Sequence, residues 1–169
     1  MAEHEVGGRH EAHQRIVKRL EDQARDVKRL TAGLDDVVLA RRVVEGKWSL
    51  KELAGHLWRV QQVFEGRLQA MLEADNPTFQ SWNPDNDPVF DQMLKQGSAE
   101  VVAGFLAARA AFVARLSSLS PADWHRPGRH PDFPNYDVHF LLEYLAHHEA
   151  HHLYQMYVRR SGLGKIPHA

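Results

Sequence analysis

The sequence of 169 residues contains no cysteine. This absence excludes a disulfide framework, thiolate metal ligands and a cysteine nucleophile, and it fits a reducing compartment. Long hydrophobic runs are also missing. The N-terminal stretch lacks an apolar core of signal-peptide length, and no uncharged segment is long enough to cross a bilayer. We therefore expect a cytoplasmic protein without a membrane partner.

Neither sign of charge dominates the sequence. The 21 Lys and Arg residues oppose 22 Asp and Glu residues, which gives a formal net charge of -1. The basic stretches "RDVKRL" and "RRSGLGK" are typical of solvated or helix-terminal charges, not of a basic face. The composition therefore predicts no nucleic-acid partner, and the length predicts a single domain over residues 1–169.

Apolar residues recur at intervals of three and four along most of the chain, which is typical of amphipathic helices. Ser49 and Glu52 have the spacing of a capping box at one helix start. No segment shows sustained alternation of apolar and polar residues, so we predict no strand. The pattern predicts an all-α fold, a four-helix bundle, whose helices run over about 10–34, from Ser49 to about 75, from the capping residue Ser98 to about 118, and over about 136–160.

Two proline-rich loops interrupt this pattern, at residues 76–97 and in the segment "HRPGRHPDFPNY". The first is long, and long ordered loops in compact domains are usually functional. Its aromatic residues Phe79, Trp82 and Phe90 could line a pocket or cover the end of the bundle, and we favour the second interpretation.

Histidine is abundant, with 12 residues, and four of them crowd into the segment "HHEAHH" of the last predicted helix. His148 and His152 are four residues apart and fall inside the apolar stripe of that helix, whereas His147 and His151 lie toward its flank. Two inward imidazoles without partners would cost about 1–3 kcal/mol each. Hydrogen bonds or bound water could satisfy them, but a divalent metal satisfies both at once, and we favour the metal.

The same segment spells HExxH, the zinc motif of many metalloproteases. That interpretation fails because Val158 occupies the position of the third metzincin histidine, and no Asp or Glu follows His152. Glu149 points well round the helix from the stripe, so we expect a solvated glutamate in preference to a general base.

A third ligand must therefore come from upstream. His56 is the only histidine of the second predicted helix and lies toward one edge of its apolar face. It could reach the pair on the last helix if the two helices are neighbours. Weaker competitors lie elsewhere in the chain: His10, His13, His125, His130 and His139.

The stretches "KWSLKELAGHL" and "HHEAHHLYQM" together resemble the DinB/YfiT superfamily of bacterial four-helix proteins, over nearly the whole chain. The resemblance implies a metal held by one histidine of the second helix and two of the last, which map onto His56, His148 and His152. It also implies a homodimer. Similar members are described as metal-dependent hydrolases or as transferases that attach low-molecular-weight thiols to electrophiles. This chain departs from the pattern in being richer in histidine around the motif.

Three nitrogen ligands would leave a coordination position open for water or substrate, as in catalytic sites. Imidazole suits zinc and nickel, which we expect ahead of iron or manganese. Gln155 and Tyr144 lie close enough to the stripe to orient a ligand or to contact substrate. The alternatives are a metal-dependent hydrolase or thiol transferase acting on a small molecule, a non-catalytic metal-binding protein associated with stress, and a purely structural dimeric bundle.

Overall fold

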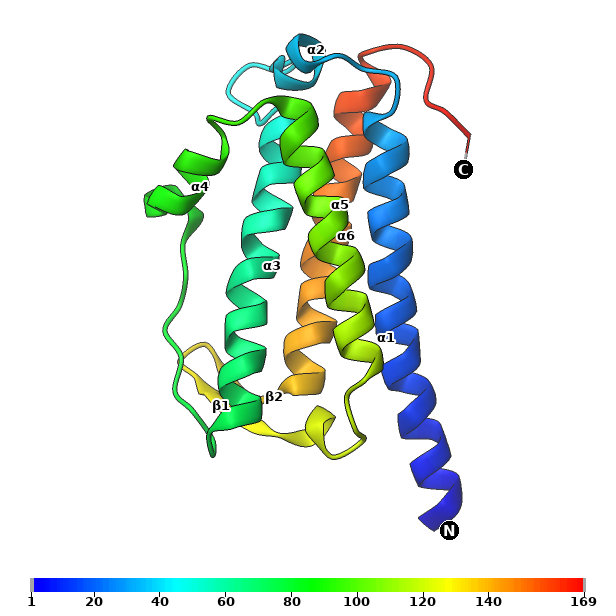
Figure 1. Cartoon of the computed structure of the whole chain (residues 1–169), viewed down its shortest axis with the longest axis vertical. Helices are drawn as coiled ribbons and strands as arrows, with labels where there is room; N and C mark the ends of the chain where they lie inside the picture. Colours follow the sequence, from blue (N-terminus) through cyan, green and yellow to red (C-terminus); the bar gives the residue numbers. More distant parts are fainter. Residues whose placement is uncertain (1, 169) are drawn as a thin grey trace.

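The computed structural model of the chain describes residues 2–168, and side chains are described from residue 10 to residue 168. Four long helices run side by side and form the bundle (Figure 1). They are α1 (Ala2–Thr31), α3 (Leu50–Glu73), α5 (Ser98–Ser117) and α6 (Val138–Ser161). The predicted all-α four-helix bundle is confirmed.

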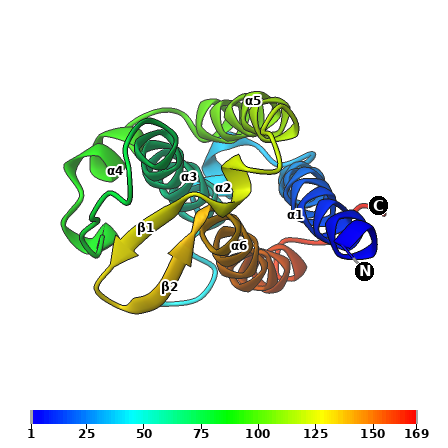
Figure 2. The same cartoon turned by 90° about the horizontal axis from the view of Figure 1, so that it is seen from below.

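The order of the helices around the bundle makes α3 and α6 neighbours. α1 contacts α5 and α6, and α3 contacts the same two helices, so that α1 and α3 lie on one diagonal (Figure 2). The connection between α3 and α5 returns along the outside of the bundle, so these two helices run in the same direction and α6 runs against α3 (Figure 1). α3 and α6 are therefore neighbours, as a site shared by His56, His148 and His152 requires.

Local capping accounts for the starts of α3 and α6. The Ser49 hydroxyl accepts a hydrogen bond from the backbone N–H of Glu52 at 3.1 Å, and the Glu52 carboxylate accepts one from Ser49 at 2.8 Å, as the capping box predicts. Asp137 caps α6 by accepting from the backbone N–H of Phe140 at 2.8 Å, and Gly162 follows the last turn. The helix begins two residues later than predicted because the preceding residues belong to a strand.

The prediction that the chain has no strand is wrong. β1 (Pro127–His130) and β2 (Phe133–Asp137) form an antiparallel hairpin across one end of the bundle (Figure 2). Each strand has five residues or fewer, and the register shifts between Gly128 and His130. Such short, irregular strands carry too little alternation to be recognised from a period of two.

The long connection between α3 and α5 is more ordered than predicted. It contains η1 (Pro84–Asn86) and α4 (Pro88–Met93), and a further short helix, α2 (Asp36–Ala40), follows α1. Ser98 is the first residue of α5 and not its cap, because Gly97 holds the cap position and the Ser98 hydroxyl donates to the Asp36 carbonyl at 2.8 Å. η2 (Asp123–His125) precedes the hairpin. Among the described helices, none combines the length and the apolar content needed to cross a membrane.

Candidate metal centre

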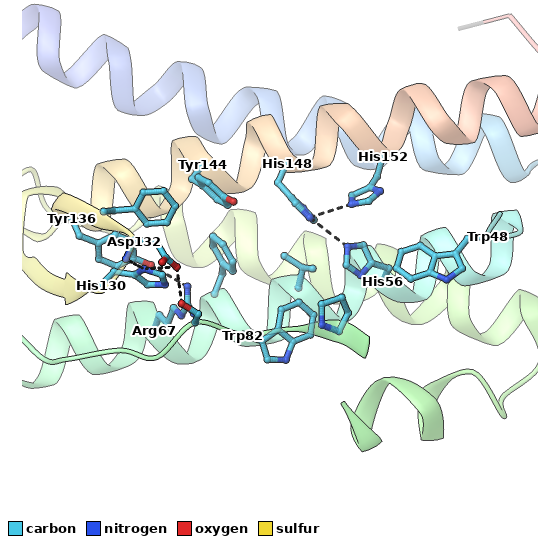
Figure 3. A pocket seen from close by; sticks show the side chains of 15 residues that line it. Trp48, His56, Arg67, Trp82, His130, Asp132, Tyr136, Tyr144, His148 and His152 are labelled. Carbon is cyan, nitrogen blue, oxygen red and sulfur yellow. Dashed lines mark hydrogen bonds and ion pairs between the residues drawn. The ribbon is translucent and has the colours of Figure 1, made fainter. Parts of the chain in front are cut away.

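Three histidine rings meet between α3 and α6 (Figure 3). His148 Nε2 lies 3.1 Å from His152 Nε2 and 3.4 Å from His56 Nε2. One nitrogen of each ring lies within 4.8 Å of the other two. The antiparallel packing of the helices sets His56 against the adjacent turns of α6 that carry the other two rings. Among the described residues, this is the one cluster of His, Asp and Glu with the spacing of a metal site.

Burial lowers the pKa of all three rings below the ordinary histidine value, which favours their neutral form at pH 7. Burial, with smaller contributions from His152 and His148, lowers the pKa of His56 to about 3. Burial, followed by the charges of His152 and His151, lowers the pKa of His148 to about 4. Burial also lowers the pKa of His152, although its hydrogen bond to Gln155 opposes this shift. A neutral imidazole keeps a nitrogen lone pair, which is the form that binds metals.

The spacing of the nitrogens fits a divalent ion. Zinc–imidazole bonds of about 2.0–2.1 Å in a tetrahedral site place two ligand nitrogens about 3.3 Å apart. The separations of 3.1 and 3.4 Å from His148 Nε2 lie on either side of that value. Without an ion, His148 Nε2 could not complete both contacts as separate hydrogen bonds, because a neutral ring nitrogen carries either one proton or one lone pair. The arrangement therefore suits a cation that all three rings can ligate.

Gln155 orients one of the rings. His152 Nδ1 lies 2.8 Å from Gln155 Oε1, so it donates to that oxygen, and its Nε2 is left free to bind a metal. The Gln155 amide nitrogen in turn lies 3.2 Å from His151 Nε2. Gln155 therefore lies where it can orient a ligand histidine, as the sequence predicts. His147 and His151 are exposed at the rim, as expected.

Aromatic packing holds His56. Its ring is 3% exposed and lies 4.9 Å from Trp48, 6.0 Å from Phe90 and 6.2 Å from Trp82, measured between ring centroids. Nδ1 of His56 and Nδ1 of His148 are buried and have no hydrogen-bond partner among the described residues. Aromatic packing therefore orients His56, whereas a hydrogen bond orients His152.

The expectation that Glu149 is a solvated surface residue is wrong. Glu149 is fully buried, and its carboxylate accepts two hydrogen bonds from the Arg109 guanidinium, at 2.7 and 2.5 Å. Arg109 also donates to Gln61 Oε1 at 2.6 Å and to the Leu20 carbonyl at 2.9 Å. Glu149 thus points into the bundle core on a different face of α6 from His148 and His152, and this position does not suit a general base at the metal centre.

The competing histidines do not join the centre. His13 is buried near one end of the bundle, stacked on Trp124 at 4.4 Å, with His139 and His125 at 5.3 and 5.5 Å. Burial, and then the charges of these neighbours, lowers the pKa of His13 to about 4. Among the described residues, the ligand atoms of this group do not have the spacing of a metal site, so we describe it as an aromatic cluster. His130 lies in the hairpin, away from the three rings (Figure 3).

A cavity of about 350 Å³ opens beside the three rings and runs between α3 and α6 toward the hairpin (Figure 3). Tyr144 and Trp82 line it, so one of the three loop aromatics does face a pocket. Phe79 packs against the core, and Phe90 is buried near His56. Polar residues line the far end of this cavity: Arg67, Ser81, His130, Asp132 and Tyr136. Of these, the sequence pattern pointed only to His130, and only as a weaker candidate for a metal ligand. Arg67 was detectable, because its spacing of eleven residues from His56 places both on one face of a helix.

The metal-free protein should lose stability as the pH falls. The pKa values of His13, His56 and His148 are about 4 or lower in the folded chain, against 6.5 for an ordinary histidine. Between pH 6.5 and about 4 the unfolded chain therefore binds more protons than the folded chain. The contribution of these three histidines to the free energy of unfolding is present above pH 6.5 and is lost as the pH falls toward 4. Urea denaturation of chelator-treated protein at pH 7.5, 6 and 5 measures this loss. A free energy of unfolding that stays constant over this range would contradict it.

The bundle and the three converging histidines define a class, the four-helix proteins with a candidate metal centre between facing helices. The chain belongs to the DinB superfamily, whose family model matches residues 19–156. Its structure is similar to that of YfiT from Bacillus subtilis, with a TM-score of 0.73, 16% sequence identity, and coverage of 90% of this chain and 87% of that one. YfiT is described as a probable metal-dependent hydrolase with an unusual four-helix bundle topology. A comparison with curated proteins finds no match.

Proposed function

We propose that this protein is a metal-dependent hydrolase of a small molecule, and that His56, His148 and His152 hold its divalent metal, zinc or nickel. The observation that carries the proposal is the meeting of three neutral imidazoles at one end of a cavity of small-molecule size. The description of YfiT as a probable metal-dependent hydrolase supports the same class.

Each residue around the three histidines would have a separate role in the reaction. A metal bound here would supply a Lewis acid that polarises a carbonyl or phosphoryl oxygen and lowers the pKa of a coordinated water. The three histidines would leave one face of the ion open toward the cavity. Gln155 would orient His152, and Trp48 and Trp82 would shield the site from bulk water. Asp132 is the one acidic residue among the described residues of the cavity wall, and it lies at the far end (Figure 3).

That lack of a carboxylate beside the rings favours a second candidate, a transferase that attaches a low-molecular-weight thiol to an electrophile. Coordination by itself favours the thiolate form of a thiol, so such a reaction needs no general base next to the metal. A non-catalytic metal-binding protein would need no cavity at this place, and we rank it third.

Activity assays separate these candidates. Chelator-treated protein reloaded with zinc or nickel is assayed against a panel of carboxylic esters and amides, and against thiols paired with an electrophilic acceptor. We expect turnover in one panel only, lost on chelation and restored by metal. Turnover in the thiol panel alone would replace the hydrolase proposal with the transferase. Metal binding without turnover in either panel would favour the non-catalytic alternative.

A further inference from the structure

The cavity has two chemically different ends. On α3, His56, Val60, Phe64 and Arg67 follow one another at intervals of four, four and three residues, so they line one face of the helix. Eleven residues separate the first from the last, which is roughly 16 Å along the helix axis. Phe64 faces Tyr144 of α6 with their rings stacked at 6.1 Å. The three imidazoles therefore lie at one end, an aromatic section follows, and Arg67 lies at the other end (Figure 3).

Arg67 is held in place by aromatic rings and hydrogen bonds. Its guanidinium lies 5.5 Å from the Phe64 ring and 5.8 Å from the Phe79 ring, measured to the centroids. It donates to the Gln80 carbonyl at 2.8 Å and to the Tyr136 hydroxyl at 3.3 Å. Among the described side chains, no carboxylate forms an ion pair with it. A half-buried guanidinium with unused donors at a cavity wall is a ready site for an anion.

His130 adds a second donor at the same end. Its side chain is 4% exposed, and its Nδ1 accepts a hydrogen bond from the backbone N–H of Asp132 at 3.2 Å. A neutral ring that accepts at Nδ1 carries its proton on Nε2, so this N–H is available to a ligand in the cavity. The Tyr136 hydroxyl, which accepts from Arg67, keeps its own proton to donate.

The remaining polar group restricts the charge of the anion. Asp132 also lines this end and is held at 2.6 Å by the Ser81 hydroxyl. Its negative charge opposes a dianion such as a phosphate monoester more than it opposes a carboxylate. A carboxylate also matches the planar fork of a guanidinium.

We propose that the substrate carries a carboxylate that binds to Arg67, His130 and Tyr136, while its reacting group lies at the three histidines. This inference rests on the proposed function, because it assumes that the reacting group meets a metal held by those rings. It identifies the substrate class as an elongated, largely apolar monoanion with the charge at the end remote from the reacting group.

Paired probes with a metal-binding head test the inference. Hydroxamic acids that end in a carboxylate are compared, at several chain lengths, with the same molecules ending in a neutral carboxamide. Their dissociation constants are measured by calorimetry on zinc-loaded protein. At the best length we expect the carboxylate to bind about tenfold to one-hundredfold more tightly than the amide, as charge-assisted hydrogen bonds warrant.

Two variants remove the same charge from different places. Arg67→Gln should bind the carboxylate and the carboxamide with about equal affinity. Arg41 is an exposed arginine outside the cavity, so Arg41→Gln should keep the preference of the parent protein. Arg67→Lys should keep part of the preference, because it restores a point charge without the fork. Retention of zinc by Arg67→Gln shows that this variant is folded.

The outcomes distinguish the two proposals. Equal binding of acid and amide by the parent protein, or a preference that survives in Arg67→Gln, overturns the inference while the metal centre stands. If neither hydroxamate binds to protein exposed to zinc, the metal centre itself is wrong, and the inference is overturned with it.

Discussion

The His148→Ala variant should lose its divalent metal. His148 is the middle ring of the three, and its Nε2 lies within 3.4 Å of Nε2 in both of the others. We expect the parent protein to retain about one zinc or nickel per chain, and the variant to bind at least about 100-fold more weakly, because two remaining ligands cannot enclose the ion. Elemental analysis after dialysis, followed by titration of metal into chelator-treated protein, measures both quantities.

The same substitution should uncouple stability from metal. An ion present at a thousand times its dissociation constant stabilises a folded protein by about 4 kcal/mol. The parent protein should gain stability of this order when excess metal is added, and His148→Ala should gain little. His147→Ala is the matched control, since His147 is the exposed neighbour on the same helix. Metal content that survives His148→Ala, or that falls equally in His147→Ala, would show that the site is misassigned.

The second large effect is expected from Glu149→Gln. This change leaves the Arg109 guanidinium, which is 1% exposed, without its carboxylate partner in the core. Removal of one member of a buried ion pair costs about 3–5 kcal/mol, because the other charge stays desolvated. The free energy of unfolding from urea denaturation measures the loss. Glu143→Gln, an exposed position on the same helix that faces His139 at 3.5 Å, should cost less than about 0.5 kcal/mol.

A double replacement tests the physical reason for this cost. Arg109→Met with Glu149→Leu removes both charges and fills the space with apolar atoms, so it should recover a large part of the stability lost in the single variant. Gln61 and the Leu20 carbonyl lose their donor in this double variant, which prevents full recovery. A single Glu149→Gln variant as stable as the parent would contradict the buried pair.

The features that the sequence predicts correctly depend on local signals. The capping box of Ser49 and Glu52 and the three-and-four spacing of apolar residues depend on neighbours within one or two turns, and the helices they predict are present. The four-residue spacing of His148 and His152 likewise predicts a shared face. The hairpin before α6 was missed because its pairing depends on a partner strand and on the bundle end beneath it.

Glu149 illustrates the opposite case. A helical pattern assigns the inward face from apolar residues, so a charged residue on another face is taken as solvated. Its burial depends on Arg109, which lies forty residues earlier on α5 and supplies the opposite charge in the core. The far end of the cavity is of the same kind, because Arg67 and His130 come from different elements that only the packed fold brings together.

The sequence by itself determined the four helices, the all-α bundle and the inward pair of histidines, because each follows from periodicity and capping within a single segment. Only the tertiary structure decided that His56 meets that pair, that Glu149 is buried, and that an arginine and a histidine close the far end of the cavity. These features depend on which helices are neighbours and on how each is rotated about its axis. Packing of the whole core sets both, and no single segment encodes either one.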